Sequence, residues 1–385
     1  MRFSEKPGGE RHPLTGGAKI VYERATKEGE MGTFGLPEVV SKISAVNPEL
    51  DQAIWEKMDA QARPNRSLGR LEEFAFRVAR IFGTLTPEIK GKTIFTFAGD
   101  HGVAEEKVSA FPQEVTHEMV ANFIRGGASV NVIAGFYGIE VSVVDIGVKG
   151  DFEGMPELVR RKVAHGTRNF LKEPAMTEAQ AMQAIQVGVD LVSEKTADGV
   201  NLFGTGDMGI ANTTPSTAVL CAVTGMSPET VTGRGTGIDE ATLKRKIKVI
   251  RQGLEKHRPD PKDPIDILCK VGGFEIAGIA GEILGAALNR CPVVVDGFIS
   301  TAGAMIALLL NPNVKDYMFM AHRSQEPGHN EMMRWIGLDP IVDLAMRLGE
   351  GTGAAIGMNL LELSTHVLND IASFEEAAVH SPEDL

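Results

Sequence analysis

The sequence predicts an α/β fold: a parallel sheet flanked by helices (Rossmann-like), with a second, smaller helical domain formed from both chain ends. Five short apolar, strand-forming runs each end in a glycine-rich or polar turn, and helix-length segments such as residues 114–136 separate most of them. Strands that alternate with helices indicate a parallel sheet covered on both faces. The runs are residues 93–98, 141–144, 200–203, 293–295 and 317–321.

Helical spacing outside these runs predicts the smaller domain. Apolar residues recur at helical intervals between residues 49 and 83, and again from residue 338 to the end. We therefore expect a large α/β catalytic domain over residues 89–337 and a small helical domain from residues 41–88 plus 338–385. Residues 1–40 show little periodicity and are expected to form a mobile extension.

The composition argues against several kinds of partner. The net charge is −12, and the basic cluster over residues 244–248 is too short to attract nucleic acid. Cys221, Cys269 and Cys291 lack the spacing of a disulfide framework or a zinc site. The sequence shows neither a signal-peptide pattern nor an apolar run long enough to cross a bilayer. We expect a cytoplasmic protein that binds neither nucleic acid nor membrane.

Two glycine-rich segments each hold one carboxylate: Gly204-Thr205-Gly206-Asp207-Met208-Gly209 and Gly349-Glu350-Gly351-Thr352-Gly353. Each is expected to form a loop that opens a helix, where backbone N–H groups can surround a phosphate. A carboxylate there repels a phosphate, so its presence favours a group that receives a proton beside a phosphate-bearing substrate. The pattern predicts an enzyme.

The ends of the predicted strands supply further polar residues. In a parallel sheet the functional groups gather at the carboxyl ends of the strands. The sequence therefore predicts that Asp100, Asp145, Asp207, Asp296 and Ser324 share one crevice.

The first glycine-rich segment also matches a dinucleotide-binding fingerprint, Gly204-x-Gly206-x-x-Gly209. The match is weak, because the acid expected at the end of a second strand is Glu229, which lies in a turn after a proline. Asp207 would also direct negative charge at a pyrophosphate. A loop for a nucleoside monophosphate is favoured, with residues 212–214 opening a helix that could hold one phosphate.

Glu350 allows two interpretations. A glutamate between helices is usually a solvated surface residue, whereas flanking glycines, which cost helix stability, favour a general base on a permissive backbone. His322 and His329 fit no zinc or iron spacing, so satisfied polar side chains are favoured. Phe111 and Met119 belong to an apolar stripe that is either core or a wall facing a flat aromatic ligand.

Six motifs occur in order from about residue 49 to the end of the chain. They are Arg66-Ser67-Leu68-Gly69-Arg70-Leu71-Glu72, Asp100-His101-Gly102-Val103, Asp207-Met208-Gly209-Ile210-Ala211-Asn212-Thr213-Thr214, Lys270-Val271-Gly272-Gly273-Phe274, Val295-Asp296-Gly297-Phe298 and Met346-Arg347-Leu348-Gly349-Glu350-Gly351-Thr352-Gly353-Ala354-Ala355. On these motifs the sequence resembles the nicotinate-nucleotide:dimethylbenzimidazole phosphoribosyltransferase family, of the lower-ligand branch of cobalamin synthesis. The resemblance implies a homodimer with a Rossmann-like large domain and a small helical domain.

The resemblance also implies residue roles. Glu350 matches the catalytic base, and Asp207 and Asp296 match active-site carboxylates, although the family has glutamate where this chain has Asp207. No metal site is implied. The substrate-binding positions are Gly206, Met208, Gly209, Ala211, Asn212, Thr213, Thr214, Lys246, Ser324, Gly349, Phe111, Met119 and Asp100.

The implied reaction transfers a phosphoribosyl group from nicotinate mononucleotide to 5,6-dimethylbenzimidazole, giving α-ribazole 5′-phosphate and nicotinate. The pyridinium departs neutral, so one carboxylate that removes the proton of the attacking benzimidazole suffices. A single displacement inverts the anomeric carbon, and no metal or redox cofactor is required. Other acceptors stay open: another benzimidazole, a purine or a phenol. The remaining alternatives are a non-catalytic nucleotide-binding module and an NAD-dependent oxidoreductase.

Overall fold

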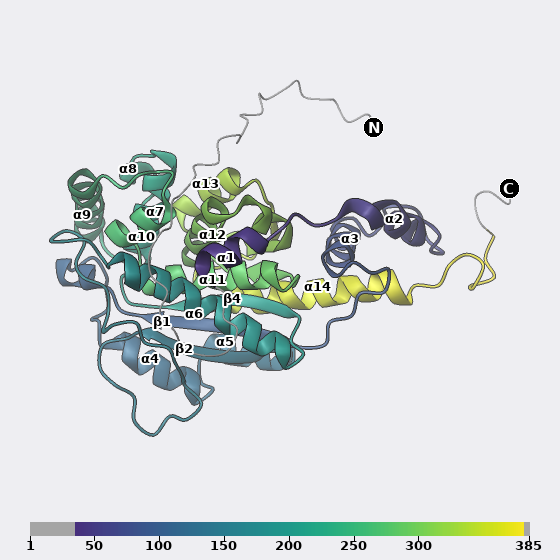
Figure 1. Cartoon of the computed structure of the whole chain (residues 1–385), viewed down its shortest axis with the longest axis horizontal. Helices are drawn as coiled ribbons and strands as arrows, with labels where there is room; N and C mark the ends of the chain where they lie inside the picture. Colours follow the sequence, from purple (N-terminus) through teal and green to yellow (C-terminus); the bar gives the residue numbers. More distant parts are fainter. Residues whose placement is uncertain (1–34, 381–385) are drawn as a thin grey trace. The chain divides into compact units, whose positions relative to one another are not determined.

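Seven parallel strands form one sheet in the computed structural model, which describes residues 35–380. The order is β3-β2-β1-β4-β5-β6-β7, and Figure 1 shows β1 between β2 and β4. The α/β class predicted from alternating strands and helices is confirmed. The strands are β1 (Lys92–Gly99), β2 (Glu140–Gly147), β3 (Val159–Arg160), β4 (Leu202–Met208), β5 (Val293–Val295), β6 (Met318–His322) and β7 (Pro340–Val342).

Helices cover both faces of this sheet. Helix α11 (Phe274–Leu288) contacts β1, β2 and β4, and its Gly278 lies against Phe97. Helix α14 (Thr352–Asp370) contacts β1, β4, β5 and β6, and Gly351 at its start lies against Ile94. Because Phe97 and Ile94 are an odd number of residues apart in β1, their side chains point to opposite faces. The two helices therefore enclose the sheet from either side.

Further helices complete the two layers. Helix α6 packs along α11, and α12 contacts α11, β4 and β5; on the other face α5 contacts β2 and α14. The helices not bounded so far are α1 (Leu36–Lys42), α2 (Asp51–Asp59), α3 (Arg70–Phe82), α4 (Val115–Ile124), α5 (Ser129–Phe136), α6 (Glu178–Ala197), α7 (Thr213–Thr224), α8 (Pro228–Val231), α9 (Glu240–His257), α10 (Pro264–Val271), α12 (Phe298–Leu310) and α13 (Pro327–Ile336), with 3-10 turns η1 (Pro48–Leu50), η2 (Gly102–Glu106) and η3 (Pro312–Tyr317). Within residues 35–380, none of the helices could cross a membrane.

Segments from both chain ends share a hydrophobic cluster. Ile54 and Met58 of α2, Ala75 and Ala79 of α3, and Leu368 of α14 are buried together. The two helices predicted between residues 49 and 83 are confirmed as α2 and α3. The division of the chain into a large and a small domain stays a prediction.

One expectation about the chain ends is wrong, one segment of the extension is ordered, and two edge strands were missed. Residues 338–385 are not wholly helical, because β7 pairs with β6 and an irregular segment follows it. The predicted extension is helical at its described end, where α1 buries Leu36 and Val39; residues 1–34 lie outside the described part. Strands β3 and β7 were not predicted, because β3 has only two residues and β7 lies in a segment whose apolar residues also fit helical spacing.

Candidate active site

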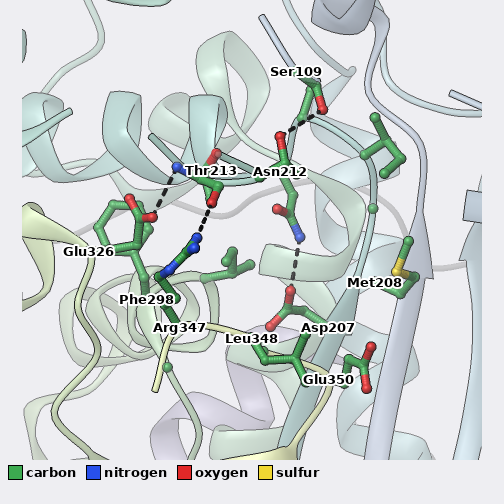
Figure 2. Close-up of a pocket in the computed structure, with 18 of the residues that line it drawn as sticks. Ser109, Asp207, Met208, Asn212, Thr213, Phe298, Glu326, Arg347, Leu348 and Glu350 are labelled. Atoms are coloured by element: carbon green, nitrogen blue, oxygen red, sulfur yellow. Dashed lines mark hydrogen bonds between the residues drawn. The ribbon is translucent and has the colours of Figure 1, made fainter. Parts of the chain in front are cut away.

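A cavity of about 430 Å³ lies beside the carboxyl ends of β4 and β6. It is close to the boundary between β1 and β4, where the strand order reverses. Open parallel sheets bind their ligands at such a boundary. Figure 2 shows the side chains that line the cavity, with Asp207 and Glu350 in one region and Glu326 and Arg347 in another.

Asp207, near the end of β4, is a buried carboxylate in the cavity wall. Its Oδ2 accepts a hydrogen bond of 2.9 Å from Asn212 Nδ2, while Oδ1 has no hydrogen-bond partner among the described residues. Burial raises the pKa of Asp207 well above its ordinary value, and Asp296, Glu275 and Glu350 raise it further. The Asp207 carboxyl group is therefore held in the cavity wall by Asn212.

Glu350 lies in a turn whose three residues all have left-handed backbone. Gly349, Glu350 and Gly351 have φ values of 87°, 67° and 97°. This conformation costs a residue with a side chain ~1–2 kcal/mol, so surrounding contacts must hold it. Thr96 Oγ1 donates a hydrogen bond of 2.9 Å to the Glu350 carbonyl, and Gly206 has no Cβ to collide with that carbonyl. The turn therefore contacts β1 through Thr96 and packs against β4 at Gly206.

The Glu350 carboxyl group is buried in the same cavity wall. Its Oε2 has no hydrogen-bond partner among the described residues. Burial raises the pKa of Glu350, the backbone N–H of Val130 at the start of α5 lowers it, and Asp296 raises it. A carboxylate with a raised pKa is a better proton acceptor, as a general base requires.

Lys246 projects from α9 into another part of the cavity. Its Nζ donates hydrogen bonds to Thr213 Oγ1 at 2.6 Å and to the Gly233 carbonyl at 3.4 Å. Burial lowers the pKa of Lys246 to about 8, although the nearby Glu326 carboxylate acts in the opposite direction. The side chain is an ammonium donor close to the start of α7.

Residues 233–237 form a glycine-rich segment that joins three parts of the site. The Gly235 N–H donates to Glu326 Oε1 at 3.0 Å, and Arg347 Nη1 donates to the Gly235 carbonyl at 2.9 Å. Ala110 N donates to Thr236 Oγ1 at 3.1 Å. Arg234 and Arg347 also line the cavity, so two guanidinium groups lie in the same lining as Lys246.

Most predicted site residues lie in this cavity. The predicted residues in its lining are Asp207, Met208, Gly209, Ala211, Asn212, Thr213, Lys246, Ser324, Gly349, Glu350, Phe111 and Met119. Phe111 and Met119 form an apolar wall together with Val108 and Val115. The apolar stripe therefore faces a cavity.

Four predicted residues lie outside the lining. Gly206 and Thr214 are buried behind it, and Asp296 is buried beneath the Glu350 turn. Asp100 lines a different cavity of about 300 Å³, where its Oδ2 accepts a hydrogen bond from Lys149 N at 2.7 Å.

The expectation of one shared crevice is therefore wrong for Asp100, Asp145 and Asp296. Asp145 forms an ion pair of 2.9 Å with Lys162, and Asp100 is turned toward the segment after β2. Only Asp207 and Ser324 of the five strand-end residues reach the cavity.

The first glycine-rich segment is a strand rather than the expected loop. Gly204 and Gly206 lie inside β4, and a Cβ atom on Gly204 would be 2.6 Å from the Met358 sulfur of α14. These glycines allow α14 and the Glu350 turn to approach the sheet, so the dinucleotide-loop alternative fails. The predicted helix starts at residues 213 and 352 are confirmed.

The two histidines differ. His329 Nδ1 accepts a hydrogen bond of 2.9 Å from Ser324 N, and its Nε2 lies 3.0 Å from Thr301 Oγ1, so this ring is satisfied as predicted. His322 lines the cavity, and its Nδ1 has no hydrogen-bond partner among the described residues. His322 was therefore misjudged, and Arg234, Glu326 and Arg347 were missed. Arg234 had a signal in the glycines on either side of it, and Arg347 in its place within the motif that contains Glu350.

Comparisons with known proteins identify the family of this chain. A family model described as phosphoribosyltransferase matches residues 43–379, and the chain belongs to this family. A relative from Geobacter sulfurreducens (strain ATCC 51573 / DSM 12127 / PCA) carries the name nicotinate-nucleotide--dimethylbenzimidazole phosphoribosyltransferase. The two are 56% identical over 344 residues, which cover 89% of this chain and 98% of the relative.

Two further comparisons extend this similarity. A relative of the same name from Geotalea uraniireducens (strain Rf4) is 56% identical over 348 residues, covering 90% of this chain and 99% of the relative. The crystal structure of CobT from Thermus thermophilus superposes with a TM-score of 0.83 at 42% identity, covering 86% of this chain and 99% of that structure. The resemblance identified from the motifs is confirmed.

Proposed function

We propose that this protein transfers the phosphoribosyl group of nicotinate mononucleotide to 5,6-dimethylbenzimidazole, giving α-ribazole 5′-phosphate and nicotinate for the lower ligand of cobalamin. One observation carries the proposal: a single cavity contains cationic groups (Lys246, Arg234 and Arg347) and the buried carboxyl groups of Asp207 and Glu350. A third buried carboxyl group, that of Glu326, lies near Lys246. The donor has the matching charges, an anionic phosphate and a cationic pyridinium-ribose. The names of the relatives support the same reaction.

The cationic groups bind and orient the donor. Lys246 Nζ, close to Thr213 Oγ1, presents its N–H groups beside the start of α7, where a helix N-terminus also favours an anion. Holding the phosphate there fixes the anomeric carbon relative to the acceptor, and such orientation can contribute several kcal/mol to catalysis, up to about 7–11 kcal/mol.

The carboxyl groups act where positive charge develops. One ring nitrogen of the benzimidazole attacks the anomeric carbon, and the bond to the nicotinate nitrogen breaks with its electron pair staying on nicotinate. The proton on the other benzimidazole nitrogen passes to Glu350, which is the general base. Asp207 stabilises the cationic ribosyl group. Burial and the neighbouring carboxylates raise the pKa of Asp207, and a positive charge bound beside it favours its ionised form.

A panel of acceptor bases tests the proposal. Purified protein is incubated with nicotinate mononucleotide and, separately, dimethylbenzimidazole, benzimidazole, adenine or a phenol, and the products are identified by mass spectrometry. A riboside phosphate of dimethylbenzimidazole supports the reaction as stated, whereas a product with another base alone changes the acceptor. No product with any base would favour a non-catalytic nucleotide-binding module.

We also infer a cytoplasmic homodimer. Val132 and Phe136 of α5 are 67% and 81% exposed, and Leu363 of the neighbouring α14 is 45% exposed. Exposed apolar side chains that gather on adjacent helices favour a protein interface. Cys221 and Cys291 are buried free thiols, which suits a reducing compartment. Light scattering should give twice the monomer mass, and Phe136→Glu should reduce it to the monomer mass.

A further inference from the structure

Asp296 caps a helix to which it does not belong. The residue follows β5 and is fully buried. Its Oδ2 accepts a hydrogen bond of 3.1 Å from Gly351 N, and its Oδ1 accepts one of 2.9 Å from Ala354 N. Both donors belong to the first turn of α14, whose N-cap residue, Gly351, has no side chain to supply an acceptor. A carboxylate satisfies these free N–H groups and also interacts favourably with the positive end of the helix.

The sheet register explains why this carboxylate lies beneath the turn. Gly204 of β4 pairs with Val294 of β5, so the register continued by two residues places Asp296 beside Gly206. Neighbouring residues in register point to the same face of a sheet. At Gly206 that face is occupied by the Glu350 carbonyl. Asp296 and Glu350 are therefore in the same layer, between the sheet and α14.

The capping carboxylate is itself held on two sides. Asp296 N donates a hydrogen bond of 3.0 Å to Thr205 Oγ1. A Cβ atom on Gly353 would lie 2.8 Å from Asp296 Oδ1, so the carboxylate packs directly on the first turn of α14. His322 Nε2 lies 3.9 Å from Asp296 Oδ1, and His322 lines the cavity whereas Asp296 does not.

We propose that Asp296 is a positioning residue for Glu350 and that it does not contact the substrate. The Asp296 carboxylate, which follows β5, accepts a hydrogen bond from Gly351 N at the end of the left-handed turn. Thr96 of β1 donates a hydrogen bond to the Glu350 carbonyl. These two hydrogen bonds, at Gly351 N and at the Glu350 carbonyl, maintain the left-handed backbone of Glu350, which is otherwise unfavourable. The Glu350 side chain enters the cavity from this backbone conformation. This inference rests on the proposed role of Glu350 as the base.

The test compares Asp296→Asn with a matched control, Asp145→Asn. Asp145 is also a buried carboxylate of a parallel strand, and it accepts a backbone hydrogen bond of 3.0 Å from Val148 N, but it lies outside the cavity. We expect Asp296→Asn to lower kcat by about 10²-fold, since a displacement of about 1 Å has effects of this size. The KM for nicotinate mononucleotide should stay within about threefold, and Asp145→Asn should change kcat by less than about threefold.

A double-mutant cycle with Glu350→Gln separates positioning from direct contact. If Asp296 acts through Glu350, then Asp296→Asn lowers the residual kcat of Glu350→Gln by less than about threefold. A further loss of about 10²-fold in that background, or a raised KM with unchanged kcat, would overturn the proposal.

A milder variant covers the case in which Asp296→Asn does not fold. Thr205→Val removes the acceptor for Asp296 N and keeps the carboxylate, so it should lower kcat at constant KM, and only when Glu350 is present. An equal loss with and without Glu350 overturns the proposal. Wild-type protein that forms no product contradicts the proposed function before any variant is compared.

Discussion

The side chain of Thr96 in β1 donates a hydrogen bond of 2.9 Å to the carbonyl of Glu350, which is far away in the sequence. This bond ties the peptide of an unusual residue, a glutamate with a φ of 67°, to a central strand of the sheet. Strained backbone that surrounding contacts maintain is typical of functional sites. The relationship places Glu350 at the centre of the predictions that follow.

Glu350→Gln should bind nicotinate mononucleotide but lose most turnover. Glutamine keeps the size of the side chain and removes the proton acceptor, and loss of a general base lowers rates by ~10²–10⁴-fold. Binding is measured by calorimetry and turnover by release of nicotinate. Turnover within about threefold of wild type would show that another group accepts the proton.

Lys246→Ala should raise the KM for the nucleotide more than it lowers kcat, because the ammonium group binds the donor as a point charge. The matched control is Lys248→Ala, which removes an exposed lysine from the same helix. A collapse of kcat at constant KM would move Lys246 into the chemical step.

The same lysine should produce a pH dependence. Its pKa is lowered to about 8, so the free enzyme loses this positive charge as the pH rises through that value. The ratio kcat/KM for nicotinate mononucleotide should therefore fall above about pH 8, and this limb should be missing in Lys246→Ala. An unchanged alkaline limb in the variant would assign it to another group.

The acceptor should be selected by shape and stacking. The wall formed by Val108, Phe111, Val115 and Met119 is apolar, and apolar pockets discriminate by only ~10–200-fold per methylene. Dimethylbenzimidazole should therefore be preferred moderately over benzimidazole and strongly over adenine, whose polar edge would lose its hydrogen bonds. Competition at equal concentrations measures this order. A preference for adenine would reveal polar partners in this wall.

Glu282→Gln should stabilise the protein, increasingly so as the pH rises. Both carboxyl oxygens of Glu282 in α11 are buried without a hydrogen-bond partner among the described residues, and burial raises its pKa well above the ordinary value. At pH values between the pKa of Glu282 in the unfolded chain and its higher pKa in the native state, only the native state keeps the carboxyl proton. Each pH unit within this window therefore lowers the free energy of unfolding by about 1.4 kcal/mol. Glutamine does not titrate, so the variant should not lose stability in this way as the pH rises.

Urea unfolding at about pH 6 and about pH 8 measures the Glu282 effect. The stability difference between Glu282→Gln and wild type should widen at the higher pH, whereas Glu255→Gln, at an exposed position, should show no such widening. A constant difference would mean that Glu282 has a partner at neutral pH.

The sequence predicted the sheet, and most of the residues predicted for the site line one cavity. The failures have identifiable causes. Glu350 could be predicted because its flanking glycines are a local signal, and Asp207 because it follows an apolar run. Asp296 also follows such a run, but its register beside Gly206 directs it under the turn. Register depends on pairing between distant segments, so the strand end alone could not predict that Asp207 lines the cavity and Asp296 does not.

Other site residues gave weaker signals. Glu326 and Arg347 enter the cavity from irregular segments whose positions depend on contacts with Gly235, more than 90 residues away. The pattern of apolar residues carries no information about such contacts. Asp100 was misplaced because a hydrogen bond from Lys149 N, after the neighbouring strand, turns its carboxylate away.

The most direct test of the proposed transfer is the reaction of purified wild-type protein with nicotinate mononucleotide and dimethylbenzimidazole, followed by mass spectrometry and by nuclear magnetic resonance of the anomeric proton. The expected products are equimolar nicotinate and a dimethylbenzimidazole riboside phosphate in the α configuration, because a single displacement inverts the β-nucleotide. A β-riboside would contradict the single displacement, and the absence of any nicotinate release would contradict the transfer itself.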